Sequence, residues 1–509
     1  MNRSIRRSLK RGQARAKSRR RRARRRRGLD RELRTRGRYS MAERVEATPY
    51  GGVALGLRVA EHVGLLSEID ERLSVLKQHQ PYTEGQHVMN IALNALCGGA
   101  ALQDIELRRN DAAFLEMLGT TQIPGASTAG DFCRRFSESA LDALQDAINE
   151  ARLNAWATQG PEFTRRTAVL DIDSSIVKTT GECKEGMELT YKGVWGYHPL
   201  LVSYANTSEP LFILNRPGAR PSVEGAPALL DRAIALCERA GHTDVLMRGD
   251  TAFTMTRHLD RWDRPGVRFV FGMMAHRGMT GRAEAIEEAL YAEFRREADK
   301  ALARPKSRAK QPRVKQQIVE DKGYKDLRLE REDIAEFEHK PSRAERTYRI
   351  VVLRKTITEH RGQLCLGNTH RYFFYITNDR EMTAAQVIRE SNQRCAQEKL
   401  IGELKSGVRS LRAPLNTTLS NGAFMIAASL AWSLKAWLAM MVPTTPRWRG
   451  KHVAERNRLL RMSFRGFVQE LMLLPLQVAR SGRKRILRIL CWRPSLAVFF
   501  RLAEALAFA

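Results

Sequence analysis

The sequence lacks the cysteine patterns that stabilise small extracellular domains or structural zinc sites. Its seven cysteines stand apart, at positions 97, 133, 183, 237, 365, 395 and 491, with no CxxC pair and no Cys/His spacing. An odd number of scattered thiols argues against a disulfide framework, and the missing spacing argues against structural zinc. We therefore expect a protein of the reducing cytoplasm.

Long apolar runs are also scarce. No apolar stretch follows the N-terminal arginines, so a secretory signal is not predicted. Residues 422–442 are largely apolar and close to membrane-spanning length, but Lys435, Ser429 and Ser433 interrupt them. A buried core helix explains this segment better than a membrane span, and we expect no membrane partner.

Negative charge is almost absent from the two ends of the chain. Residues 1–40 contain 19 Lys and Arg against 2 Asp and Glu, and residues 443–509 contain 14 against 3, within a formal net charge of +31. Such ends predict a polyanionic partner. With few apolar residues, segment 1–40 is predicted to be a disordered Arg-rich tail. Because Met41 opens an ordinary composition, a functional tail and an upstream-start artefact are equally good interpretations.

The body of the chain changes pattern twice. Residues 41–160 show the 3.6-residue periodicity of helices, which suits a DNA-binding and assembly domain or a plain packing domain. Residues 161–442 form the predicted catalytic domain. Short apolar strands at 167–172, 198–204 and 211–214 precede a helix at 226–240, a strand at 244–247, a helix at 254–262 and a strand at 268–273.

This order of elements is that of a ribonuclease-H-like α/β fold. A charged, β-containing insertion at 276–370 is predicted before a long helix at 383–405, and a basic helical region follows at 443–509.

Four polar residues of the 383–405 segment share one helical face. Ser391, Arg394, Glu398 and Lys405 are separated by three, four and seven positions. At about 100° per residue they fall within roughly 60° of each other. A carboxylate between two cations suits a divalent metal and a phosphodiester.

Two aspartates upstream complete a candidate carboxylate triad. Asp173 ends the strand Leu-Asp-Ile-Asp, and Asp250 follows the strand that ends at Arg248-Gly249. Three carboxylates can hold two Mg²⁺ ions, with Mn²⁺ as a substitute, and no His/Cys cluster points to zinc. The leading interpretation is a metal-dependent enzyme that cuts DNA, with Asp173, Asp250 and Glu398 as catalytic ligands.

Each of these residues also has a plainer explanation. Asp250 could cap the helix that follows it, and Glu398 could pair with Arg394 on an exposed surface. Asp171 shares a strand face with Asp173, but Asp173 lies nearer the strand end and is the better candidate. Two carboxylates on one face are costly to bury without cations, which favours a metal.

The motif set resembles the DDE transposases of bacterial insertion sequences. Arg394, Glu398 and Lys405 match the family signature of Tyr, Arg, Glu and Lys in type and spacing, while Ser391 replaces its Tyr. Residues 170–175 and 248–253 are similar to its two aspartate strands. Together with segments 196–204, 215–218 and 373–378, they resemble the insertion-sequence family numbered thirteen-eighty.

The resemblance implies cut-and-paste transposition on double-stranded DNA. A homodimer would bind terminal inverted repeats, cleave them and join the 3′-OH ends to target DNA near the nucleoid. Ser391, Arg394 and Lys405 would contact phosphates. No Trp stands between Trp262 and Trp432, so base flipping and a hairpin intermediate stay open. A decayed copy without strand transfer, or a non-catalytic basic DNA-binding protein, are the alternatives.

Overall fold

The computed structural model describes residues 2–25, 46–294, 322, 325–361, 364–481 and 484–506. Two compact units share the chain. Unit 1 combines Met1–Thr164, Ser174–Arg220 and Glu398–Ala509, and unit 2 combines Arg165–Asp173 and Pro221–Gln397. The predicted domains, with boundaries at residues 40, 160 and 442, are continuous stretches of chain, whereas each unit combines several separate stretches. The predicted boundaries stay predictions.

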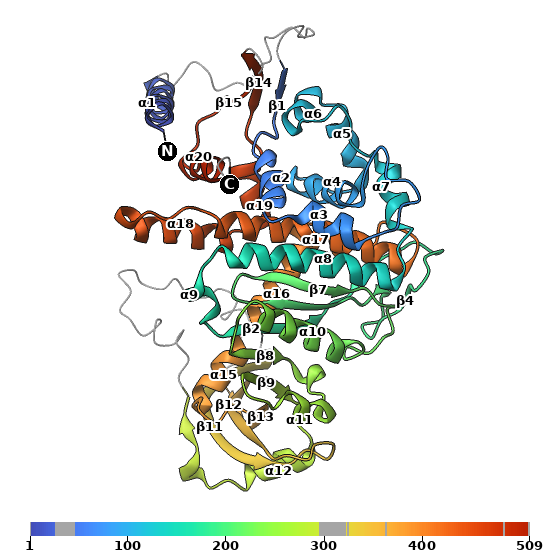
Figure 1. Ribbon diagram of the computed structural model, residues 1–509. Helices are drawn as coiled ribbons and strands as arrows, with labels where there is room; N and C mark the ends of the chain where they lie inside the picture. The colour runs from blue at the N-terminus through green and yellow to red at the C-terminus, as the bar shows by residue number, and fades with distance from the viewer. Residues whose placement is uncertain are drawn as a thin grey trace. The chain divides into compact units, whose positions relative to one another are not determined.

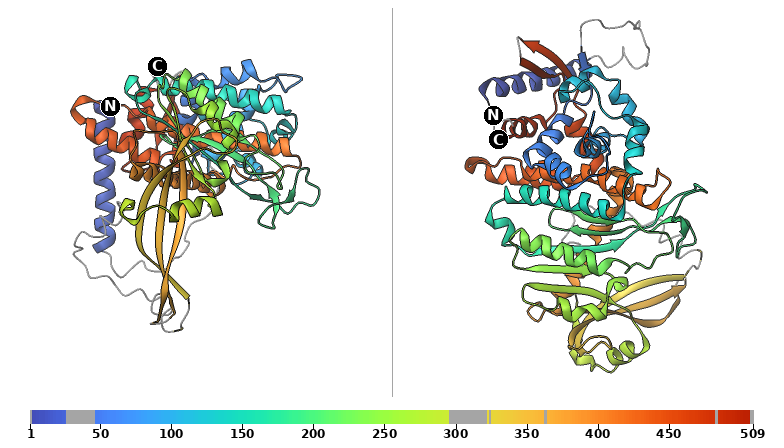
Figure 2. Two further views of the ribbon diagram at one scale, coloured as in Figure 1. Left: turned by 90° about the horizontal axis from the view of Figure 1, so that it is seen from below. Right: turned by 45° about the vertical axis from the view of Figure 1, so that its right-hand side comes forward.

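Unit 2 is built on a mixed sheet. The strand order is β10-β11-β12-β13-β9-β8-β2. The strands span β2 (Ala168–Ser174), β8 (Val245–Gly249), β9 (Val267–Met273), β10 (Ala292–Glu293), β11 (Lys325–His339), β12 (Tyr348–Arg361) and β13 (Leu364–Thr377). β2, β8 and β9 are parallel, while β13 pairs with β9 in antiparallel fashion. The described part of the predicted insertion thus extends the sheet through the long strands seen in Figure 2.

Apolar side chains explain why the strands and helices of unit 2 pack. Every residue of β8 is buried, as expected for a strand between two parallel neighbours. Helix α15 (Ala384–Gln393) places Val387 and Ile388 in a cluster with Leu246 and Val270 of the sheet. A capping box between Thr383 and Gln386 fixes where α15 begins. The other helices of unit 2 are α10 (Ala226–Arg239), α11 (Leu259–Trp262) and α12 (Arg277–Glu284).

The order of elements along the chain confirms the predicted fold class. After β2 and three short strands comes the antiparallel pair β6 (Leu200–Tyr204) and β7 (Glu209–Leu214), which belongs to unit 1. α10, β8 and β9 follow, each within a few residues of its predicted position. The fold is α/β with a large mixed sheet and a ribonuclease-H-like core.

Unit 1 is mainly helical and is centred on one apolar helix. α17 (Thr418–Met440) has the length and composition of a membrane span, yet every residue from Ser420 to Met440 is buried. It packs against α2, α4, α7 and α8, as Figure 1 shows, so the predicted core helix is confirmed. The α-helices between β1 (Glu46–Thr48) and β2 are α2 (Val53–His62), α3 (Leu65–Arg72), α4 (Glu84–Leu96), α5 (Ile105–Arg109), α6 (Ala112–Leu118), α7 (Ala126–Cys133), α8 (Glu138–Ala157) and α9 (Pro161–Thr164).

The C-terminal part of unit 1 adds helices and a small sheet. β14 (Leu476–Ser481) lies between β1 (Glu46–Thr48) and β15 (Lys484–Ile489). The α-helices of this C-terminal part are α18 (Arg449–Arg461), α19 (Phe464–Phe467) and α20 (Leu496–Ala505).

A second small sheet of unit 1 contains β3 (Val177–Lys178), β5 (Trp195–Tyr197) and β4 (Glu188–Leu189).

The predicted disorder of segment 1–40 is wrong for its first half, because Arg3–Arg25 forms helix α1. Ile5, Leu9, Gly12 and Ala16 are its half-buried positions. Their spacing of four, three and four places them on one face, which gives the helix a packing surface despite its charge. Residues 26–40 of the predicted tail lie outside the described residues.

Candidate active site

Two of the predicted catalytic aspartates share one edge of the unit 2 sheet. β2 and β8 are parallel neighbours in which Asp171 pairs with Arg248. Asp173 and Asp250 each come two residues later: Asp173 is the penultimate residue of β2, and Asp250 directly follows the last residue of β8. Since open α/β sheets carry their sites at that edge, the two carboxylates occupy a suitable position.

The first aspartate, Asp173, is paired with a cation. Arg394 Nη1 lies 3.3 Å from Asp173 Oδ2, and the side chains are 18% and 16% exposed. Arg394 is the C-cap of α15, so the packing of α15 on the sheet determines where this guanidinium stands. The structure therefore brings together two residues that the sequence places 221 positions apart.

The second aspartate of β2 has a different environment. Asp171 is 1% exposed and forms a bidentate pair with Arg248, with Nε–Oδ1 at 2.7 Å and Nη2–Oδ2 at 2.9 Å. Arg248 also donates to Glu390 Oε2 at 3.0 Å. Burial opposes charge on Arg248, but the hydrogen bonds and charge of Asp171 outweigh it and raise the pKa of the guanidinium.

Arginines therefore supply the cations that two carboxylates on one strand face require. From the sequence alone, a metal ion is the expected source of positive charge for these two carboxylates, and neither Arg248 nor Glu390 is predicted as a partner. Arg248 lies two residues before Asp250, so the two side chains point to the same face of the sheet. This spacing is the signal in the sequence that Arg248 could be a partner of Asp171.

Asp250 caps the turn that follows its strand, as the plainer explanation predicted. Its Oδ1 accepts a hydrogen bond of 2.9 Å from the backbone N–H of Ala252, and η2 (Thr251–Phe253) begins there. Capping uses one lone pair of one oxygen, so this carboxylate keeps further acceptor capacity. Gly249 before it packs closely, since a Cβ there would lie 3.0 Å from Phe253 Cβ and Phe271 Cδ1.

The single long helix predicted for 383–405 is wrong. α15 ends at Gln393, Arg394 is a turn residue, α16 (Cys395–Gly402) follows, and η5 (Glu403–Gly407) is π-helical. A constant 3.6-residue period cannot be carried across two such irregularities, so the one-face argument for the four polar residues fails. π-helical turns are frequent at functional sites.

The remaining candidates of this segment are divided between the units. Ser391 is a half-buried residue of α15 in unit 2, and its carbonyl accepts from the Arg394 N–H at 3.3 Å. Glu398 is an exposed residue of α16 and opens the last segment of unit 1. Its grouping with Asp173 and Asp250 stays a prediction.

Lys405 stands beside a hollow within unit 1. Its Nζ donates to the carbonyl of Ile176 at 2.7 Å, which fixes the ammonium near β3. The hollow has a volume of about 570 Å³, and Lys178 and Arg412 also line it. Three cations around one cavity suit an anionic ligand. The phosphate contact predicted for Lys405 stays a prediction.

The donor chemistry at the sheet edge fits a hard divalent cation. Asp173 and Asp250 offer carboxylate oxygens, the ligands that Mg²⁺ and Mn²⁺ prefer. Across the described ranges, no group of three or more His, Cys, Asp or Glu side chains is gathered closely enough to hold a metal ion. A metal site at the two aspartates therefore stays a prediction, and it would need a further oxygen ligand.

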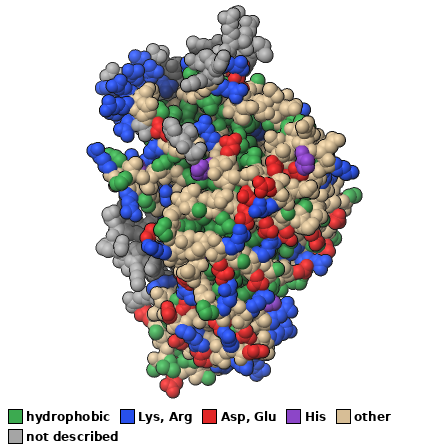
Figure 3. All heavy atoms as spheres, in the orientation of Figure 1, with side chains coloured by type: hydrophobic (Ala, Val, Ile, Leu, Met, Phe, Trp, Pro, Cys, Tyr) green, Lys and Arg blue, Asp and Glu red, His purple; other side chains and the backbone are tan. Residues whose placement is uncertain are grey.

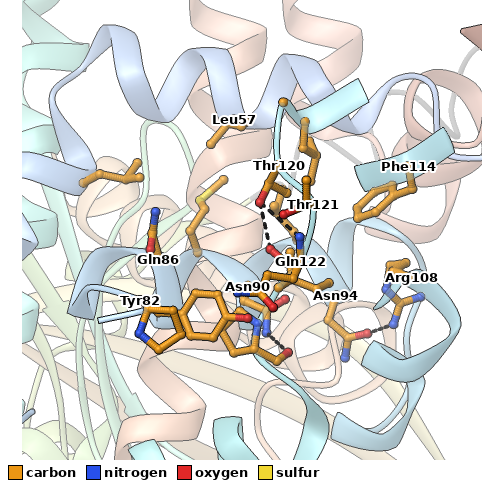
Figure 4. A pocket seen from close by; sticks show the side chains of 18 of the residues that line it. Leu57, Tyr82, Gln86, Asn90, Asn94, Arg108, Phe114, Thr120, Thr121 and Gln122 are labelled. Carbon is orange, nitrogen blue, oxygen red and sulfur yellow. Dashed lines mark hydrogen bonds between the residues drawn. The ribbon is translucent and has the colours of Figure 1, made fainter. Parts of the chain in front are cut away.

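The N-terminal helices of unit 1 contain a pocket that the sequence did not predict. Figure 4 shows it lined by both apolar and polar side chains, and its volume is about 410 Å³. Arg108 is buried in its wall, hydrogen bonds to Asn94 and lies 5.8 Å from the ring centroid of Tyr50. Neutral partners thus hold this guanidinium.

The α/β core with carboxylates at the strand ends belongs to the ribonuclease-H-like class. Residues 46–479 match the model of the Transposase DDE domain group 1 family, so the chain belongs to that family. No curated protein matches the sequence.

One similar solved structure is the piggyBac transposase in a cryo-EM synaptic complex with hairpin DNA. The two chains are 10% identical, with a TM-score of 0.36, and the match covers 84% of this chain and 82% of the other.

Proposed function

We propose that this chain cleaves the ends of an insertion sequence and joins the freed 3′-OH ends to target DNA. Its membership of a DDE transposase family supports transposase function generally. The observation that carries the finer proposal is the placement of Asp173 and Asp250 at the carboxyl ends of parallel, neighbouring strands, with Arg394 paired to Asp173.

The proposed roles follow from charge. Asp173 and Asp250, with Glu398 as the further oxygen ligand, would hold two Mg²⁺ or Mn²⁺ ions. Such ions activate the attacking oxygen and neutralise the leaving one. Arg394 balances the charge of Asp173 and offers a fork of donors to a phosphate, whereas Lys405 offers a point charge. Ser391, shorter than the family Tyr, would make at most a local contact.

The finer identity is also part of the proposal. The segments quoted above resemble the insertion-sequence family numbered thirteen-eighty, and we assign the chain to it. The active form would be a homodimer bound to double-stranded DNA in the bacterial cytoplasm, with terminal inverted repeats and target DNA as its two substrates.

Carboxylate-to-amide substitutions test the triad. Asp173→Asn, Asp250→Asn and Glu398→Gln should each keep binding to a labelled terminal-repeat duplex and lower Mg²⁺-dependent cleavage by more than about 10³-fold. An amide removes the negative charge that a metal requires while leaving the shape almost unchanged. Cleavage and strand transfer would be followed on denaturing gels.

A matched control is Glu287→Gln, which changes an exposed carboxylate of unit 2 beside η4 (Glu288–Leu290). It should cut at the wild-type rate. Persistent cleavage in any of the three test variants would show that the triad is wrongly assigned. A wild-type protein that binds the repeats but never cuts them would instead be a decayed transposase.

A further inference from the structure

Helix α1 is held in place although its own charges oppose it. Between Arg3 and Arg22 it contains eleven Lys and Arg and no Asp or Glu. Like charges three or four positions apart each cost a few tenths of a kcal/mol, and an isolated helix is marginal even without them. Something outside α1 must therefore stabilise it.

The C-terminal segment of unit 1 provides a seat for α1. A Cβ at Gly12 would lie 2.9 Å from Trp492 Cδ1, so the helix backbone approaches the indole directly. The backbone N–H of Asn2 donates to Glu504 Oε1 of α20 at 2.9 Å. Gly12 belongs to the half-buried face of α1, so this face meets the segment after β15.

Docking encloses a hollow that is lined by both apolar and cationic side chains. A cavity of about 1220 Å³ lies between α1, β15 and α20, and its charged lining is Arg11, Arg15, Arg19, Arg22 and Arg488. No acidic residue is among those that line it, and within the described chain these arginines form no ion pair. Figure 3 shows Lys and Arg side chains gathered over α1.

Three of the arginines that line the cavity form a regular row along α1. Arg11, Arg15 and Arg19 are four residues apart, which corresponds to a rise of about 6 Å per step along a helix. A polynucleotide backbone presents one negative charge per nucleotide at regular intervals, so a regular row of cations can neutralise several phosphates at once. Guanidinium groups bind phosphate through paired donors.

We propose that the groove between α1 and β15 binds the sugar-phosphate backbone of DNA without sequence preference, apart from the carboxylate site. The choice of DNA among polyanions rests on the proposed function. The contact would hold flanking or target DNA while the sheet edge acts elsewhere on the substrate.

The test compares two faces of α1 in the full-length protein. Arg11, Arg15, Arg19 and Arg22 are changed together to Gln, which keeps helix propensity. The matched control changes Arg3, Lys10, Lys17 and Arg21 to Gln, removing the same charge about 130° around the helix. Binding of a labelled random-sequence duplex is measured by fluorescence anisotropy over a range of salt concentrations.

The groove-face variant should flatten the slope of log affinity against log salt by about 3 to 4. The control should flatten it by less than about 1. Equal effects of the two variants would overturn the groove and leave only diffuse charge. The variant Gly12→Val, which keeps every charge but contacts Trp492, should also weaken binding, and wild-type affinity in it would count against a docked groove.

Vesicles separate DNA from the other polyanionic surface. If the groove-face variant lost binding to phosphatidylserine vesicles but not to DNA, the groove would be a membrane site and the proposal would fail. The duplex carries no terminal repeat, so the result does not depend on cleavage. A groove that binds DNA in a protein that never cuts would leave this inference standing and reject the proposed function.

Discussion

At the scale of single residues, Arg248 separates the roles of the two aspartates on β2. Its buried guanidinium occupies both oxygens of Asp171 and also reaches the partly exposed Glu390. Asp173 lies two residues later, nearer solvent, with Arg394 at 3.3 Å. One carboxylate is therefore committed to the fold, while the other is placed where a substrate could compete for its partner.

Unfolding measurements distinguish these two aspartates. Asp171→Asn should lower the free energy of unfolding by about 3–5 kcal/mol, because it removes half of a buried ion pair. Asp173→Asn should cost less than about 1 kcal/mol, because its pair is partly exposed. Urea denaturation of both variants, followed by circular dichroism, provides the comparison. Equal losses would mean that Asp173 is also a structural residue.

At the scale of elements, α17 shows what burial does to a helix that carries a lysine. Lys435 is 1% exposed, donates to the carbonyl of Leu460 at 2.9 Å and lies 3.9 Å from the ring centroid of Trp432. Burial lowers the pKa of Lys435 to about 7, with Glu403 opposing and Lys399 assisting the shift. The amine is thus sealed in the core and titrates far below an ordinary lysine.

The pH dependence follows from proton linkage. In the unfolded chain Lys435 keeps its ordinary pKa of 10.5, so between about pH 7 and 10 the unfolded state binds more protons. The native state therefore becomes less stable as pH falls through that window, by up to about 1.4 kcal/mol per pH unit. Lys435→Met should raise the free energy of unfolding at pH 7, and its advantage should shrink towards pH 10.

The control is Lys451→Met, which changes a lysine of the neighbouring helix α18 whose side chain is 67% exposed. Its difference from wild type should stay constant across the same pH range, as measured by urea titrations at each pH. A constant difference for Lys435→Met as well would show that the buried amine is charged throughout.

Elements with a strong local signal could be predicted from the sequence. The strands β2, β8 and β9 and helix α10 are short or amphipathic segments with clear apolar patterns, and each was located within a few residues. The sequence predicts α17 as a core helix and not a membrane span, because Lys435 and two serines interrupt its apolar run.

Elements that depend on distant partners could not be predicted. Helix α1 forms because Gly12 packs on Trp492, a contact 480 positions away that no local pattern contains. The break at Arg394 and the π-helical turn at η5 are adjustments within a segment whose sequence reads as continuous helix. The pairing of Asp171 with Arg248 required the register of two strands.

At the scale of the whole molecule, unit 1 is assembled from three separate stretches of chain. Glu209 on β7 is fully buried and accepts hydrogen bonds from Arg152 and Trp156 of α8 and from Trp437 of α17, at 3.1, 3.1 and 2.7 Å. One carboxylate thus joins all three stretches of the unit.

Removing this carboxylate should destabilise unit 1 as a whole. Glu209→Leu leaves Arg152 buried without its counter-charge and two indole N–H groups without an acceptor, so we expect a loss of about 3–5 kcal/mol. Glu71→Leu, on an exposed carboxylate of α3, should change stability by less than about 0.5 kcal/mol. Thermal melting of both variants checks the difference, and a similar melting point would contradict a central role for Glu209.

The position of α17 in the sequence has a consequence for biosynthesis. The apolar faces of α2, α4 and α8 emerge from the ribosome more than 250 residues before the helix that covers them. Until translation passes residue 440, a nascent chain exposes those faces to chaperones and proteases. A gene copy with a premature stop ahead of α17 would therefore yield a polypeptide that is degraded or aggregates, not a shortened working protein.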